Sequence, residues 1–152
     1  MESLELISNY FIRLGMINNR PISNKKLQKL VYYSQAWSLA LYGEPLFQED
    51  IQAWVHGPVI PSLYQKYKNY QFHPIVNDQL LKETPRLDCA ELLDEIWDIY
   101  GKYDSNYLEL LTHRETPWRN ARANLEPNEN SDNTISLEDM KMYYSSLLNE
   151  EN

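Results

Sequence analysis

The segment from Ser23 to Gly43 constrains the fold more than any other part of the chain. Its apolar and small residues recur every three or four positions, the spacing that places side chains on one face of an α-helix. These residues are Leu27, Leu30, Val31, Ser34, Trp37, Ser38 and Leu41. Ser23 can cap the amino end through its hydroxyl, and Gly43 can adopt the left-handed conformation that ends a helix. A helix of about twenty residues is ~30 Å long, so we expect a central helix around which the rest of the chain packs.

Length and composition are those of one globular domain. A chain of 152 residues with 43% apolar residues can bury a core of its own, so we expect a single domain over 1–152. No run approaches the ~18 consecutive apolar residues of a membrane span, and the residues after Met1 lack the basic and apolar regions of a signal peptide. The single cysteine, Cys89, excludes an internal disulfide. These features predict a cytoplasmic protein.

Charge is distributed unevenly along the chain. Residues 1–70 carry seven Lys/Arg and five Asp/Glu, whereas residues 71–152 carry seven and seventeen, which accounts for the net charge of −8. An acidic half repels phosphate backbones, so nucleic-acid binding is not expected. The acidity either serves solubility or forms a surface for a basic partner, and composition leaves both interpretations open.

Apolar periodicity and capping residues predict shorter helices around the central one. We expect these helices at 1–14, 61–69, 88–100, 105–111, 117–124 and 136–149, with Asp88, Thr116 and Ser136 among the N-caps. Alternating apolar residues predict a short strand at 51–55, and a second strand is expected at 73–76 within a loop from 71 to 86. Residues 126–134 are polar and predict another loop. The predicted fold is a mainly α-helical, single-domain bundle around a central helix, with a small β element.

The residue pattern offers little for catalysis or metal binding. Cys89 falls on the predicted first turn of a helix without a neighbouring His or Lys, which favours a buried structural thiol. His56, His73 and His113 are far apart and match no metal-ligand spacing, so no metal or cofactor is expected. An enzyme that uses His56, His113 or Thr112 in a shared cleft is one alternative. A transcriptional regulator is another, which the acidic second half disfavours.

Several segments together resemble a known protein family. They are KLQKLVYYSQAW from Lys26 to Trp37, GEPLF from Gly43 to Phe47, AWVHGPVIP from Ala53 to Pro61, Tyr100 to Tyr103 with Leu108, and LTHRETPW from Leu111 to Trp118. In order and spacing they resemble the Panacea domain family, which includes SocA-like antitoxins and phage-associated GepA-like proteins. The resemblance covers roughly 4–122, and the tail after Arg122 matches nothing recognised.

The resemblance implies an antitoxin that binds and neutralises a toxin protein encoded nearby, by contact and without chemistry. In the SocA-like members it further implies an adaptor that delivers the bound toxin to the ClpXP protease. Some members carry an additional DNA-binding segment, whereas this chain starts directly at the domain, which makes DNA-mediated autoregulation less expected. The resemblance does not specify which toxin is bound, and the oligomeric state stays open.

The predicted partner-binding residues lie off the apolar stripe of the central helix, at the turn after the strand, and in the closing motif. They are Gln28, Lys29, Tyr32, Tyr33, Trp54, His56, Gly57, Pro58 and His113. We expect Lys29, Tyr32 and Tyr33 on the exposed side of the helix. The alternatives are structural: the tyrosines cover a seam between helices, the Gly-Pro pair fixes a turn, and His113 bonds a loop carbonyl. The acidic helix at 88–100 is the next candidate for the binding surface.

Overall fold

The computed structural model describes residues 1–150 and confirms a mainly α-helical fold with one small sheet. The elements in chain order are α1 (Leu4–Ile17), α2 (Asn24–Tyr42), β1 (Gln52–Trp54), β2 (Gly57–Val59), α3 (Pro61–Tyr67), η1 (Lys68–Tyr70), η2 (Asp78–Leu81), α4 (Ala90–Tyr100), α5 (Ser105–Arg114), α6 (Thr116–Ala121) and α7 (Leu137–Glu150). Both η elements are single turns of 3-10 helix. Within the described range, no helix combines the length and apolar character needed to cross a membrane.

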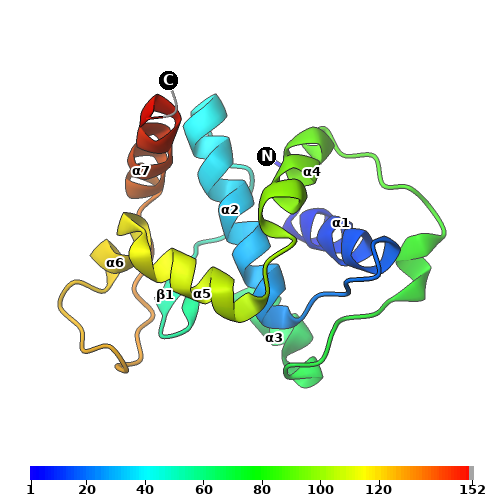
Figure 1. The fold of residues 1–152 in the computed structure, drawn as a ribbon, viewed down its shortest axis with the longest axis horizontal. Coiled ribbons are helices and arrows are strands. Elements are labelled where there is room, and N and C mark those ends of the chain that lie inside the picture. The colour runs from blue at the N-terminus through cyan, green and yellow to red at the C-terminus, as the bar shows by residue number, and fades with distance from the viewer. Residues whose placement is uncertain (151–152) are drawn as a thin grey trace.

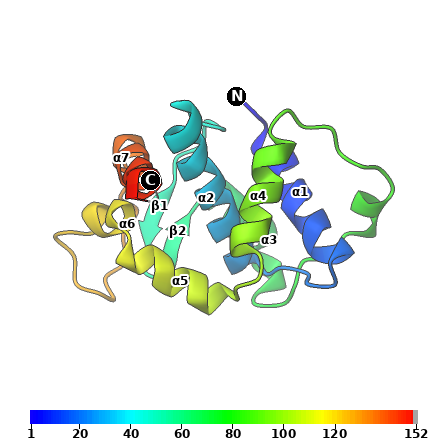
Figure 2. The ribbon, with the colours of Figure 1, turned by 45° about the horizontal axis from the view of Figure 1, so that its top comes forward.

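Helix α2 is the centre of the molecule, and its ends lie where the sequence predicts them. Ser23 Oγ accepts a hydrogen bond from the Lys26 backbone N–H at 3.2 Å, and Gly43 has a φ of +75°. Helices α1 and α4 pack on one side of α2, and α7 packs on the other (Figure 1). Helix α5 and strand β2 contact the amino-terminal half of α2 (Figure 2). The central helix is therefore covered from several directions.

The prediction that Lys29, Tyr32 and Tyr33 lie on an exposed side of α2 is wrong. Gln28, Lys29, Tyr32 and Tyr33 are each at most 1% exposed. An amphipathic helix keeps a solvent-facing side only where its neighbours cover one stripe, and here neighbours cover both sides of its first three turns. Conversely, Leu41 on the predicted buried stripe is 42% exposed, because it lies in the last turn of α2, beside a groove.

Helix α1 begins and ends three residues later than the predicted range of 1–14. It continues to Ile17, and Gly15 lies inside it at a close approach between the helix and the chain that follows. A Cβ at Gly15 would lie 2.8 Å from the Arg20 carbonyl oxygen, so the glycine allows this segment to turn back toward α2. The glycine therefore has a packing role at this position.

The region between α3 and α4 differs from the prediction. Residues 73–76 form no strand; Ile75 instead anchors the loop through a hydrogen bond from its backbone N–H to the Ile22 carbonyl at 2.7 Å. Asn77 then caps the 3-10 turn η2. Helix α4 begins at Ala90 with Cys89 as its N-cap, and Asp88 makes no capping bond.

The predicted strand near 51–55 is confirmed as β1, which forms an antiparallel hairpin with β2. Gly57 and Pro58, expected in the turn after this strand, are part of the return strand β2. Residues 133–135 extend along the other edge of β1: the Ala53 N–H donates to the Asn133 carbonyl at 2.8 Å, and the Ile135 N–H donates to the Ile51 carbonyl at 2.8 Å. The 126–134 loop is thereby attached to the hairpin.

The carboxyl-terminal helices follow the predicted order. Helix α6 has Glu115 as its N-cap, one residue before the predicted Thr116. At the start of α7, Ser136 Oγ accepts from the Asp139 N–H at 3.1 Å, as the capping pattern predicts. Met140 and Tyr144 of α7 are fully buried against α2.

Candidate functional site

The two densest motif segments meet at the β1–β2 hairpin. The indole N–H of Trp118 on α6 donates to the Trp54 carbonyl of β1 at 2.8 Å. His56 at the tip of the hairpin places its Nδ1 3.2 Å from Glu109 Oε1 on α5. Segments more than fifty residues apart in the sequence therefore form one surface. The structure brings Trp54, His56 and His113 together here.

Gln28 and Lys29 support this surface from inside. Gln28 Oε1 accepts from the Ile60 N–H at 2.9 Å, and Gln28 Nε2 donates to Asn24 Oδ1 at 3.0 Å. Lys29 Nζ donates to the Pro58 carbonyl at 3.2 Å. Both side chains thus hold the strand β2 against α2. A polar group can be buried when it finds such a partner, which explains two polar residues in the core.

Lys29 is a buried amine in an environment that disfavours its charge. Its pKa is lowered to about 7, mainly by burial and in addition by nearby Lys25, while Glu109 opposes the change. Gly57 lies directly against this side chain: a Cβ there would be 2.6 Å from Lys29 Cε. Its φ of +111° also favours glycine. The expected structural role of the Gly-Pro pair as a turn device thus has a concrete basis.

Tyr32 and Tyr33 belong to a buried hydroxyl network around Glu115. Tyr33 OH donates to Glu115 Oε1 at 2.7 Å, and Tyr144 OH of α7 donates to the same oxygen at 2.9 Å. The hydroxyls of Tyr32 and Tyr144 are 3.1 Å apart, and the Tyr33 ring stacks on Tyr100 with centroids 3.9 Å apart. The alternative in which the tyrosines seal a seam between helices agrees with these contacts.

The electrostatics of this network favour the protonated form of its groups. Burial raises the pKa of Glu115 to about 7, although the hydrogen bonds from Tyr33 and Tyr144 act in the opposite direction. Burial also raises the pKa of Tyr32, Tyr33 and Tyr144 well above the usual range, so these hydroxyls remain hydrogen-bond donors. No hydrogen-bonded or ion-paired cation among residues 1–150 balances the Glu115 carboxylate. Sequence reasoning missed Glu115, because charged residues are rarely fully buried.

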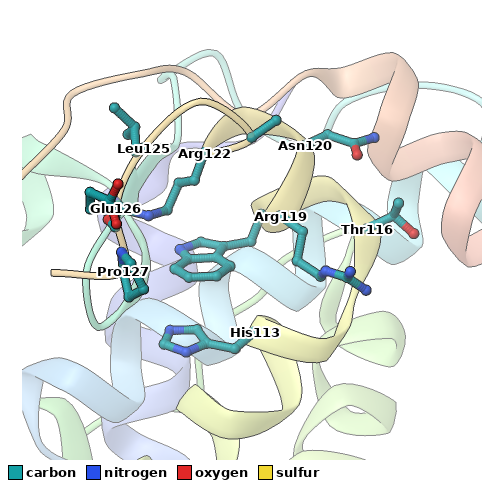
Figure 3. A pocket seen from close by; sticks show the side chains of 10 residues that line it. His113, Thr116, Arg119, Asn120, Arg122, Leu125, Glu126 and Pro127 are labelled. Atoms are coloured by element: carbon teal, nitrogen blue, oxygen red, sulfur yellow. The ribbon is translucent and has the colours of Figure 1, made fainter. Parts of the chain in front are cut away.

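His113 is half-buried and makes a ring contact with α6. Its imidazole stacks on Trp118 with ring centroids 3.8 Å apart. Figure 3 shows that His113 and Arg122 line the same pocket. Burial lowers the pKa of His113, and Lys29 and His56 lower it further against the pull of Glu109. These effects favour the neutral imidazole, which adds an aromatic face to the site.

Arg122 fastens the loop after α6 to the hairpin and was missed in the sequence analysis. Its guanidinium donates to the Ala53 carbonyl at 2.8 Å and to the carbonyls of Glu126 and Glu129, and it lies 5.3 Å from the Trp118 ring. The only sequence signal for the contact between the two side chains is that Arg122 follows Trp118 by four residues. A pocket of about 600 Å³ lies between His113, Arg122 and the loop at 125–127 (Figure 3).

Two side chains that could act as nucleophiles lie in surroundings that disfavour reaction. Thr112 Oγ1 donates to the Glu109 carbonyl at 2.8 Å and is fully buried, so it is not placed as a nucleophile. Burial, with a smaller contribution from Glu2, raises the pKa of the Cys89 thiol to about 11, which disfavours the reactive thiolate. Within 1–150 no group of three or more His, Cys, Asp or Glu side chains is placed to hold a metal ion.

Comparison with known proteins assigns the family. Residues 27–119 match the family model described as antitoxin SocA-like, Panacea domain. The chain belongs to this family. Antitoxin SocA of Caulobacter vibrioides (strain NA1000 / CB15N) is 29% identical over 124 residues, covering 74% of this chain and 66% of that protein. The chain thus matches just under two thirds of the relative's length. No solved structure matches the chain.

The family match covers the segments that form the surface at the hairpin. It contains α2 from Leu27 onward, the hairpin, α5 and the first residues of α6, so both contacting motif segments lie inside it. Helices α1 and α7 lie outside it. The Glu115 network therefore joins a matched part of the chain to α7, which the family model does not cover.

Proposed function

We propose that this chain is a cytoplasmic antitoxin that neutralises a toxin protein encoded beside it by direct binding. The observation that carries the proposal is the SocA-like Panacea domain match over 27–119. The similarity to Antitoxin SocA supports the same role. Neutralisation then needs no reaction, in keeping with the absence of an activated nucleophile among the residues described above.

The hairpin surface is the proposed toxin contact. His56 is exposed, and Trp54 and His113 are half-buried beside it, so all three can meet a partner. Gly57 and Pro58 are buried and position this turn. Gln28 and Lys29 act from below through their bonds to β2, and Tyr32 and Tyr33 act through the packing of the core. Their proposed contribution to toxin binding is therefore indirect.

Titrated co-expression tests the mechanism. The product of the neighbouring gene is expressed at a fixed toxic level while the supply of this protein is varied. Binding without turnover predicts that protection requires about one antitoxin molecule per toxin. Protection at levels far below that of the toxin would contradict simple binding and would indicate catalysis or recycling.

Repeating the titration in a host that lacks ClpX separates neutralisation by binding alone from neutralisation that requires ClpXP. We propose that the protein, like an adaptor, also delivers the bound toxin to ClpXP. Loss of protection in the host without ClpX is the expected result for the adaptor. Unchanged protection there would exclude the adaptor role and leave neutralisation by binding alone.

Matched histidine variants test the proposed contact surface. His56 and His73 are both exposed, but only His56 lies at the hairpin. His56→Ala should weaken the affinity for the purified toxin by more than ~1 kcal/mol, whereas His73→Ala should not. Melting curves of both variants should match the wild type. Equal affinities of all three proteins would move the contact away from the hairpin.

A further inference from the structure

An apolar groove lies on the opposite part of the molecule from the hairpin, between α4 and α7. The carboxyl-terminal turns of α2 lie between these helices (Figure 1). The groove has a volume of about 450 Å³, and apart from Glu95 and Glu150 every residue of the described range 1–150 that lines it is aliphatic or aromatic. Trp37 forms part of its floor, fixed by a hydrogen bond from its indole N–H to Tyr100 OH at 2.9 Å.

Apolar side chains in this groove are open to solvent. Leu41 is 42% exposed and Ile99 is 52% exposed, and both line the groove. Contiguous exposed apolar surface of this kind marks interaction sites. A hollow between helices with an apolar floor fits an amphipathic helix, which presents anchors at positions i, i+3, i+4 and i+7.

The charge around the groove selects the kind of helix. Glu95 and Glu150 flank it, and no Lys or Arg is among the residues that line it in the described part of the chain. The outer face of α4 adds Glu91 and Asp98, which are exposed and have no ion-pair partner within residues 1–150. This rim attracts a basic segment and repels an acidic one.

We propose that the groove between α4 and α7 is the docking site for a basic amphipathic helix of the toxin, with apolar anchors on one face and Lys or Arg along its edges. The proposal rests on the proposed function, because it assigns the occupant to the toxin. It adds a second contact surface, distinct from the hairpin, and states the chemistry of the toxin segment that binds it.

Two synthetic peptides test the chemistry of the groove without the toxin. Both are about 18 residues long, ~27 Å as a helix, with leucine at the anchor positions. One carries lysine at all other positions and the other carries glutamate. We expect the lysine peptide to bind the wild-type protein in fluorescence anisotropy, with affinity falling as NaCl rises from about 50 to about 500 mM. Equal binding of the two peptides would overturn the proposal.

Matched variants locate the binding. Ile99→Lys places a cation in the groove, and Leu110→Lys on α5 is the control, because Leu110 is 56% exposed and lies outside the groove. Ile99→Lys should weaken lysine-peptide binding at least roughly tenfold, whereas Leu110→Lys should leave it within about twofold. Unchanged binding by Ile99→Lys would overturn the proposal. A wild-type dimer that Ile99→Lys dissociates would also overturn it, because a second copy would then fill the groove.

The purified product of the neighbouring gene tests the identity of the occupant. If it binds wild type and Leu110→Lys equally but Ile99→Lys at least roughly tenfold more weakly, the groove is a toxin contact. If it binds all three equally, the groove proposal fails and the antitoxin function stands. If it does not bind the wild type, the proposed function fails and with it the toxin as the occupant, even where the lysine peptide binds.

Discussion

Glu115 is a buried carboxylic acid whose hydrogen-bond partners are tyrosine hydroxyls. It is 5% exposed, and its Oε1 accepts from both Tyr33 and Tyr144. Burial raises its pKa from 4.5 to about 7, so the folded protein binds this proton more tightly than the unfolded chain does. The stability that results is complete below pH 4.5 and is lost as the pH rises through about 7.

Glu115→Gln should remove this pH dependence. The amide keeps an oxygen acceptor for the two tyrosines and has no proton to lose. At about 1.4 kcal/mol per pH unit, the wild type should lose up to about 3 kcal/mol relative to the variant between pH 4.5 and pH 8. Urea unfolding at several pH values measures the difference. Glu138→Gln, at an exposed position of α7, should run parallel to the wild type. If the difference in unfolding free energy between Glu115→Gln and the wild type does not change with pH, the pH dependence does not come from Glu115.

The β1–β2 hairpin requires glycine at position 57 for two reasons, the backbone conformation and the close packing of the residue. Gly57 has a φ of +111° and faces the buried Lys29 side chain. Gly43 also has a positive φ, of +75°, but the nearest atom to a Cβ there is Lys141 Nζ at 4.0 Å. Substitutions at these two glycines therefore distinguish the cost of backbone strain alone from the cost of strain combined with a steric conflict.

Gly57→Ala should destabilise the protein more than Gly43→Ala. In Gly43→Ala only the left-handed backbone conformation is penalised, by about 1–2 kcal/mol. In Gly57→Ala the new methyl group must also displace Lys29, so a further ~1–3 kcal/mol is expected from overpacking. Chemical unfolding of the two variants at one pH compares the costs. Equal costs would mean that the Lys29 side chain moves aside freely.

Helix α7, which lies far from the α2 motif in the sequence, completes the core of the molecule. Helix α7 contributes Met140 and Tyr144, both fully buried, and Tyr144 completes the hydrogen bonds of Glu115. Residues 136–150 lie beyond the family match, which ends at residue 119. The core is thus assembled from both ends of the chain.

Two methionines on α7 provide a matched test of this closure. Met140 is fully buried, and Met142 is 63% exposed. Met140→Ala should cost about 2–5 kcal/mol of folding free energy, because it leaves a cavity against α2. Met142→Ala should stay within about 0.5 kcal/mol of the wild type. Thermal and urea unfolding measure both. A small effect of Met140→Ala would mean that α7 is dispensable for the fold.

Local sequence signals determined several features that survive in the structure. The limits of α2 follow from Ser23 and Gly43, whose capping geometry depends only on neighbouring residues. The same holds for Ser136 at the start of α7. Alternation predicted β1, and the motif segments predicted the family. These features could be read from the sequence because helix caps, short strands and motifs are encoded within a few residues.

The tertiary structure alone decided which side of α2 is buried. Periodicity defines one apolar stripe, but Tyr32 and Tyr33 are covered because α7 and α4 arrive from distant parts of the chain. Lys29 is tolerated inside because Pro58 supplies an acceptor that no local pattern announces. Likewise Leu41 stays open because nothing in the described chain fills the groove beside it. Burial of a polar residue depends on partners brought by long-range packing, and a local pattern contains no information about them.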